Sequence, residues 1–189
     1  MIFSSGGLSF ARFDDSAEHL ALAKACFSDW PNAPTTEQIE SDAAMWAAKA
    51  LEAHYPLTEE SNFMNALAVT DEASGELVAI IRYEGLGQTC HVAHHLVHPM
   101  YRQRGYHTKM VKAAFAYAFE MLEATDCVFQ VLVASEPVLR VGRKWGYKEI
   151  AKTLTGNGQQ VRHMQLTRES YMQLGADFHA TDLRRAANK

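Results

Sequence analysis

A stretch without acidic residues holds most of the side chains that could do chemistry. Between Gly85 and Phe119 there is no Asp or Glu, although the formal net charge of the whole chain is −4. The stretch carries four of the basic residues and five of the nine histidines. They are Arg102, Arg104, Lys109 and Lys112, with His91, His94, His95, His98 and His107. Cationic and hydrogen-bonding side chains suit an anionic ligand, so we expect an anion-binding site here.

The loop Arg102-Gln103-Arg104-Gly105-Tyr106-His107 is the best candidate for that site. It lies between a strand pattern that stops at Pro99 and a long apolar-rich helix pattern from Lys109 to Glu123. Unpaired backbone N–H groups and the positive end of the helix dipole face such a junction. Gly105 would allow close approach of a phosphate because it has no Cβ. The alternative is an exposed basic turn before an ordinary helix.

The histidines before this loop are candidates for proton transfer. A histidine has an unperturbed pKa of about 6.5, so it can accept a proton near neutral pH. Strand alternation predicts His91 and His95 on one face of the sheet, with His94 and His98 on the other. Two ligands per face are too few for a structural zinc, so we expect no metal site. The alternative for each histidine is a partly buried, hydrogen-bonded side chain.

Periodicity and turn residues predict the elements that position these groups. Helices are expected at 17–27, at 35–53, at 109–123 and at 136–145, the last closed by Gly146. Strands are expected at 10–13, 65–70, 76–83, 90–97, 127–133, 147–150 and 161–166, with turns at 71–75 and 156–158. Their order predicts an α/β (α+β) fold with a mixed, mostly antiparallel sheet and helices on its faces.

Composition limits the class of protein. The chain has 189 residues, of which 48% are hydrophobic and 21% charged, which fits one globular domain. Its pI near 6.1 argues against direct nucleic-acid binding. Three cysteines without a CxxC pattern indicate reduced core residues and a cytoplasmic location. No apolar run approaches the ~20 residues of a membrane span, and the N-terminus lacks a signal-peptide pattern.

The run from Leu96 to His107 resembles the acetyl-CoA signature of the GNAT superfamily of N-acetyltransferases. That signature is a strand ending in an apolar-Val-x-Pro type sequence, then [Gln/Arg]-x-x-Gly-x-[Gly/Ala], then a long helix. Arg143-Lys144-Trp145-Gly146-Tyr147 resembles the turn that closes the CoA site in this superfamily. The resemblance implies a sheet of about six or seven strands with helices on both faces. It covers a domain at residues 1–167, followed by an extension at 168–189 that we expect to be helical.

The resemblance also implies a reaction and its residues. Acetyl-CoA would be the co-substrate, and its acetyl group would pass to a primary amine of a small molecule or protein by direct attack in a ternary complex. The cofactor-binding residues would be Leu96, Val97, Arg102, Gln103, Arg104, Gly105, Tyr106, His107 and Arg140. A backbone N–H near Val97 would polarise the thioester carbonyl. Alignment of the loops places the general base on His91, with His95 second and Tyr83 and Glu84 as further candidates.

Three positions depart from the family pattern. His107 occupies a position where the family prefers Gly or Ala. Gly142 occupies the place of the tyrosine that protonates the leaving thiolate in many members, and Ser135 the place of the usual Asn. These departures leave open a second hypothesis, a binding module that keeps the fold without turnover. Residues of the early helices would either border the acceptor pocket or pack in the core: Trp30, Met45, Trp46 and Tyr55. The tail after Arg168 would form a homodimer contact.

Overall fold

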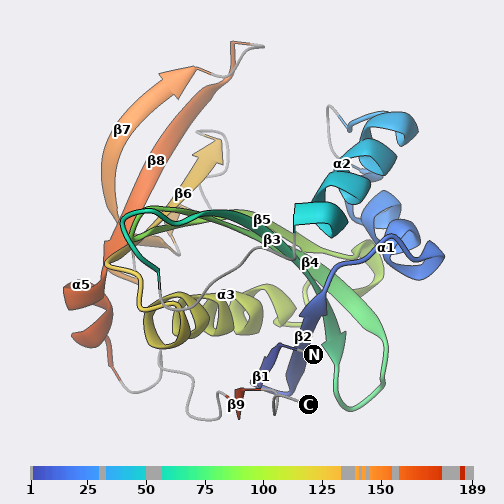
Figure 1. Cartoon of the computed structure of the whole chain (residues 1–189), viewed down its shortest axis with the longest axis horizontal. Coiled ribbons are helices and arrows are strands. Elements are labelled where there is room, and N and C mark those ends of the chain that lie inside the picture. Colours follow the sequence, from blue (N-terminus) through green and yellow to red (C-terminus); the bar gives the residue numbers. More distant parts are fainter. Residues whose placement is uncertain are drawn as a thin grey trace.

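A computed structural model gives one nine-stranded sheet with helices on both faces (Figure 1). It describes residues 2–29, 33–49, 57–132, 139–140, 142–143, 145–154, 158–175 and 184–185. The strand order is β7-β8-β6-β5-β4-β3-β2-β1-β9. The strands are β1 Phe3–Ser5, β2 Leu8–Arg12, β3 Asn62–Asp71, β4 Leu77–Leu86, β5 Thr89–Val97, β6 Asp126–Leu132, β7 Lys148–Leu154, β8 Gln160–Thr167 and β9 Arg184–Arg185. The predicted fold class is confirmed, with more strands than the six or seven expected.

The early helices form where capping residues and composition predict them. Helix α1 spans Ala17–Phe27, and the Ser16 hydroxyl accepts a hydrogen bond from the His19 amide at 3.3 Å. Such a side-chain cap satisfies one of the open N–H groups of the first turn. Helix α2 spans Thr36–Lys49, and its predicted continuation to residue 53 lies outside the described residues.

The third helix starts earlier than its apolar pattern indicates. Helix α3 spans Tyr106–Ala116 and continues as a π-helical turn, η2, over Tyr117–Met121. The Leu122 amide donates to the Tyr117 carbonyl at 2.9 Å, which is the wider hydrogen bond of a π turn. The extra first turn places Tyr106 and His107 in the helix, directly after Gly105.

Two hydrophobic layers hold the helices to the sheet. Helices α1 and α2 cover one face, where Phe13, Leu22, Trp46, Ile80 and Leu96 are buried together (Figure 1). Helix α3 covers the other face over a larger core. Its members include Phe3, Phe10, Leu67, Ile81, Tyr83, Val92, Val97, Met110, Phe115 and Tyr117. The two faces of β4 and β5 therefore look onto different helices.

An irregularity in the β4–β5 ladder changes which face the histidines occupy. Ile81 pairs with His95 and Tyr83 pairs with Val92. Between these two pairs there is one residue on β4 and there are two on β5. A bulge of this kind inserts one residue and interrupts the alternation of side chains. His95 shares the α3 face with Ile81, whereas His91, next to buried Val92, lies on the α1/α2 face. The prediction that His91 and His95 share a face is wrong, because alternation alone does not contain the bulge.

The β5–β6 pair is parallel and short. Thr89, Cys90 and His91 pair with Asp126, Cys127 and Val128, and the described pairing of the two strands ends there. Strand β5 continues to Val97, while β6 continues beside β8 up to Leu132. The two strands therefore diverge after His91, and β6–β8 turn away from the rest of the sheet (Figure 1).

The residues after β8 contribute two small elements. Helix α5 spans Arg168–Met172, and β9, Arg184–Arg185, pairs antiparallel with β1. Other residues of this extension, 176–183 and 186–189, lie outside the described part, so its predicted helical character is not decided there. Among the described helices, none is long and apolar enough to cross a membrane.

Candidate functional site

The loop before α3 has an unusual backbone. The 3₁₀ turn η1, Pro99–Tyr101, is capped by His98, whose Nδ1 accepts from the Met100 amide at 3.2 Å. Gln103 then adopts φ 62° and Gly105 φ 82°, both in the left-handed region. Left-handed residues in a loop turn successive N–H groups toward one side, a concave arrangement that binds anions. A Cβ at Gly105 would meet nothing within 4 Å, so the glycine leaves open space beside this backbone.

Six consecutive amides at this junction have no acceptor in the part of the chain that the structure describes. They belong to Gln103, Arg104, Gly105, Tyr106, His107 and Thr108. The first amide with one is that of Lys109, which donates to the Gly105 carbonyl at 3.2 Å. Open N–H groups at a helix N-terminus, with the positive end of its dipole, bind phosphate groups. The main chain therefore presents a row of open donors at the junction where the sequence predicts an anion site.

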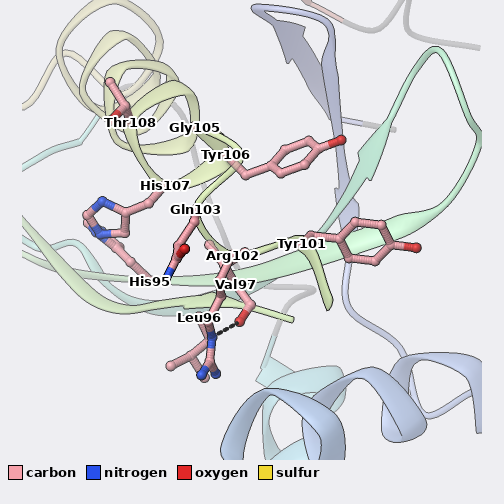
Figure 2. A pocket seen from close by; sticks show the side chains of 10 residues that line it. All are labelled: His95, Leu96, Val97, Tyr101, Arg102, Gln103, Gly105, Tyr106, His107 and Thr108. Carbon is pink, nitrogen blue, oxygen red and sulfur yellow. Dashed lines mark hydrogen bonds between the residues drawn. The ribbon is translucent and has the colours of Figure 1, made fainter. Parts of the chain in front are cut away.

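A pocket of about 410 Å³ opens beside these amides (Figure 2). Its lining comes from the end of β5, from the loop and from the first turn of α3. The residues are His95, Leu96, Val97, Tyr101, Arg102, Gln103, Gly105, Tyr106, His107 and Thr108. All of the predicted cofactor-binding residues line it except Arg104 and Arg140, both of which are exposed. The pocket thus joins the junction with its open amides to the edge of β5 that the described part of β6 leaves unpaired.

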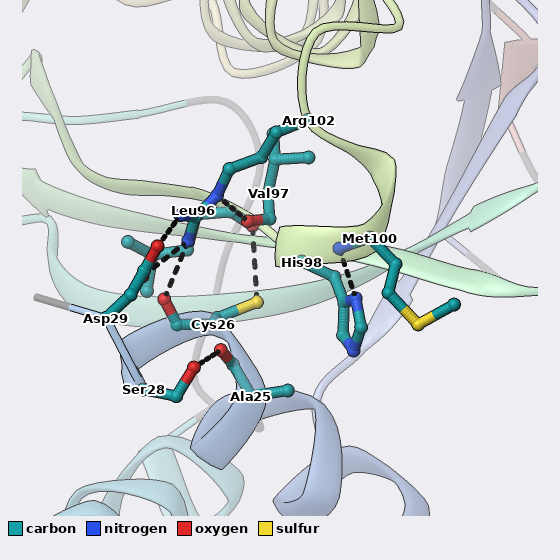
Figure 3. A network of polar contacts seen from close by, with 9 residues as sticks. All are labelled: Ala25, Cys26, Ser28, Asp29, Leu96, Val97, His98, Met100 and Arg102. Atoms are coloured by element: carbon teal, nitrogen blue, oxygen red, sulfur yellow. Dashed lines mark hydrogen bonds and ion pairs between the residues drawn. The ribbon is translucent and has the colours of Figure 1, made fainter.

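The Arg102 guanidinium turns away from this junction toward α1 (Figure 3). Its Nε donates to the Val97 carbonyl at 3.0 Å, and one Nη donates to Asp29 at 3.0 Å and to the Cys26 carbonyl at 3.4 Å. The other Nη also pairs with Asp29. The Arg102 side chain lowers the pKa of the Asp29 carboxyl, first through hydrogen bonding. These contacts tie the end of α1 to the end of β5. The Arg102 side chain is therefore not placed to make the expected contact with a phosphate.

Tyr101 and Tyr106 extend to the turn between β3 and β4. The Tyr106 hydroxyl donates to the Asp71 carboxylate at 2.6 Å. That hydrogen bond is the main cause of the lowered pKa of Asp71 and of the raised pKa of Tyr106. The Glu76 carboxylate raises the pKa of Tyr101 in the same way. The two tyrosine side chains anchor the loop to this turn, so Tyr106 offers its amide to the pocket.

His95 and His107 face each other on the α3 side of the pocket (Figure 2). Their ring centroids are 5.8 Å apart. Burial lowers the pKa of His107 below its ordinary value of 6.5, so this ring is neutral at pH 7. The His107 ring therefore packs toward β5, while the His107 amide remains at the junction.

His91 lies on the opposite face, in a row of larger side chains. Met64, Glu84 and His91 are partners across β3, β4 and β5, and Val128 is the neighbour of His91 on β6. Arg82 lies two residues from Glu84 on the same face. We call Met64, Arg82, Glu84, His91 and Val128 the acceptor face. It continues the α1/α2 side of the sheet to the point where β5 and β6 diverge, and the lining of the pocket begins four residues further along β5, at His95.

Gly142, at the position that the resemblance assigns to a tyrosine, is buried between two aromatic side chains. A Cβ on it would lie 3.5 Å from the rings of Phe129 and Tyr147, an ordinary van der Waals contact. These rings pack edge to face, with centroids 4.2 Å apart. The turn that follows has the predicted form, since Gly146 adopts φ 78°. Ser135 lies outside the described residues.

Several residues of the site could not be selected from the sequence. Asp29 and Asp71 are separated from the loop by many residues, and only their partnership with Arg102 and Tyr106 gives them a role. Trp46 is fully buried and packs edge to face on Phe13 at 5.6 Å, so core packing describes it. Trp30 and Tyr55 lie outside the described residues, and Met45 packs at the margin of the same core. Within the described residues, no three His, Cys, Asp or Glu side chains are grouped to hold a metal ion.

Solved structures share this fold at low sequence identity. Spermidine N-acetyltransferase from Vibrio cholerae, in complex with CoA and spermine, matches with TM-score 0.66 and 13% identity over 88% of this chain and 98% of that one. An acetyltransferase of the GNAT family from Bacillus anthracis matches with TM-score 0.64 and 17% identity over 89% and 99%. A dodecameric spermidine N-acetyltransferase from Vibrio cholerae matches with TM-score 0.66 and 12% identity over 88% and 97%.

At these identities the structural matches show the fold alone. No curated protein sequence matches the chain. The profile of the acetyltransferase (GNAT) family, in contrast, matches residues 22–147. That range includes the second half of α1, all of α2, the loop with its open amides and the Gly146–Tyr147 turn. Together with the shared fold, this match establishes that the chain belongs to the GNAT acetyltransferase family.

Proposed function

We propose that this protein transfers an acetyl group from acetyl-CoA to a primary amine by direct attack in a ternary complex. The observation that carries the proposal is the set of six open amides from Gln103 to Thr108, which lie beside a pocket leading to the unpaired edge of β5. The amides would hold the pyrophosphate of CoA. The thioester arm would run along β5 from Val97 toward the point where β5 and β6 separate.

The two histidines on opposite faces suit two different proton transfers. The amine nitrogen attacks the thioester carbonyl carbon, and the C–S bond breaks as the C–N bond forms. His91, on the acceptor face, would take the proton that the amine loses. His95, on the pocket side, would return a proton to the leaving thiolate in place of the missing tyrosine hydroxyl. A backbone N–H near Val97 would bind the carbonyl oxygen as its charge develops.

Calorimetric titration of acetyl-CoA into the protein and a Gly105→Trp variant tests the cofactor assignment. The indole would fill the space beside the open amides, so we expect binding by the native protein and at least a 100-fold loss in the variant. Gly158→Trp is a matched control, because Gly158 also has a positive φ and open space beside its Cα, far along the chain from the loop. Absence of binding to the native protein, or equal binding by Gly105→Trp, would overturn the assignment.

A second candidate function is that of a module that binds acetyl-CoA without catalysing acetyl transfer. Gly142 favours it, because this chain has no phenol at the position where the resemblance places the acid. Release of CoA thiol across a panel of amines separates the two functions. A protein that binds acetyl-CoA but releases no thiol with any amine is a binding module, whereas thiol release shows the transferase.

A further inference from the structure

The acceptor face carries a paired positive and negative charge beside His91. Arg82 and Glu84 form an ion pair, with Nη2 and Oε1 2.8 Å apart. Their side chains are 18% and 36% exposed, so the pair is partly buried but open to a ligand. Glu84 is the direct cross-strand partner of His91. A ligand that reaches His91 along this face therefore also reaches both charges.

Arg82 retains unused hydrogen-bonding capacity. Its Nε is buried and has no hydrogen-bond partner, and Glu84 is its one ion-pair partner in the described residues. The guanidinium carbon lies 5.9 Å from the Trp46 ring centroid, so α2 borders it on one side. Its cross-strand neighbour on β3 is Ala66, a small residue. The planar set of N–H groups of a guanidinium matches the two oxygens of a carboxylate.

We infer that the acetyl acceptor is a zwitterion, a free amino acid whose carboxylate binds Arg82 and whose ammonium binds Glu84. This inference rests on the proposed function and names the class of its acceptor. The amino acid carries the same two charges as the ion pair, and each would replace one partner of the Arg82–Glu84 contact. Each charge of the amino acid that leaves water on binding then meets an opposite charge of the protein. No ion is buried without a partner, and the free-energy cost of an unpaired buried charge is avoided.

The same arrangement brings the amine to the proposed base. An ammonium bound at Glu84 lies across the ladder from His91. The ammonium would lose its first proton to solvent, and His91 would take the second proton, which the nitrogen loses as it attacks the thioester. The positive charge of Arg82 favours loss of that proton, because it destabilises a neighbouring cation. A polyamine offers Arg82 no carboxylate and adds positive charge next to it. The spermine complex of the Vibrio cholerae relative is therefore a poor guide to this acceptor.

Acetyl transfer by the native protein to matched acceptors tests the inference. The panel contains the common L-amino acids, each with its carboxamide, together with spermidine and butylamine. We expect at least one amino acid to exceed its own amide, spermidine and butylamine in kcat/KM by about 10- to 100-fold, the value of one charge-assisted hydrogen-bonded contact. Amides or spermidine that match or exceed every amino acid would overturn the inference, as would binding of acetyl-CoA without transfer to any amino acid.

Variants locate the carboxylate contact. Arg82→Gln is expected to raise KM for the preferred amino acid by about 10- to 100-fold, with a much smaller change for its amide. Arg82→Lys keeps the charge and guards against misfolding, and it should recover part of the loss. Arg12→Gln, on an exposed position of β2, is the matched control and should leave both KM values unchanged. Equal effects of Arg82→Gln on the acid and the amide would contradict the inference. Failure of acetyl-CoA to bind would instead remove the proposed function on which it rests.

Discussion

The two halves of the site are built from different material. The junction before α3, where we propose that phosphate binds, consists of main-chain N–H groups, and the side chains of Arg102 and Tyr106 turn outward to Asp29 and Asp71. The acceptor face consists of side chains, with Arg82, Glu84 and His91 projecting from adjacent strands. A backbone site depends on local conformation and tolerates many side chains. A side-chain site depends on strand register, so a single inserted residue changes which groups meet.

The largest effect is expected from His91→Gln, which removes the proposed base while keeping a polar side chain of similar size. Because His91 lies on the acceptor face, kcat should fall by about 100-fold or more while the Kd for acetyl-CoA stays unchanged. Steady-state kinetics and calorimetry measure the two quantities. His163→Gln on β8, which β6 separates from β5, is the control. A weaker affinity for acetyl-CoA with unchanged kcat would mean that His91 contributes to cofactor binding. It would contradict the assignment of His91 to the acceptor face.

Arg102→Gln separates support of the junction from direct contact with phosphate. The guanidinium holds Val97 and Asp29, so its loss should lower the melting temperature by about 4 °C. The affinity for acetyl-CoA should fall less than tenfold, because the open amides remain. Thermal unfolding and calorimetry give both values. An affinity loss as large as that of Gly105→Trp, without a change in melting temperature, would make Arg102 a phosphate ligand instead.

Tyr106→Phe tests whether the outward side chain anchors the loop. We expect a melting temperature about 2 °C lower near pH 7, because the hydrogen bond to Asp71 is lost. The folded pKa of Asp71 is lowered, so this contribution is full above its ordinary 3.8 and disappears as pH falls below that value. The folded pKa of Tyr106 is raised, so the contribution is also lost as pH rises beyond the ordinary 10.0.

Unfolding of native protein and Tyr106→Phe across this pH range supplies the check. The difference between the two proteins should be widest between the two limits and should close at both ends. A difference that does not change with pH would mean that the phenol stabilises the loop by packing alone.

The same contrast explains what could be predicted from sequence. The junction follows from Gly105, the preceding Pro99 and the apolar helix, all within a few residues, and its backbone has the expected form. Helices α1 and α3 and the central strands likewise follow from local periodicity. The opposite faces of His91 and His95 could not be predicted, because the bulge is a property of pairing between β4 and β5. Arg82 could not be selected from the sequence for the same reason, since the Trp46 ring beside it comes from α2.

The smallest effect concerns His107, where the junction and a side chain meet. Burial lowers its folded pKa below 6.5, so the unfolded chain binds more protons than the folded one as pH falls below that value. Stability from the neutral ring is therefore full above about pH 6.5 and decreases below it. His107→Gln lacks this titration, so the melting temperature of the native protein should fall relative to the variant by no more than about 2 °C on acidification. Thr108→Ala, at the next position, removes no titrating group and should follow the native protein at every pH. If the melting temperature of His107→Gln changes with pH as that of the native protein does, protonation of the His107 ring costs no stability. The pocket beside His95 would then be more open to water than the burial of His107 indicates.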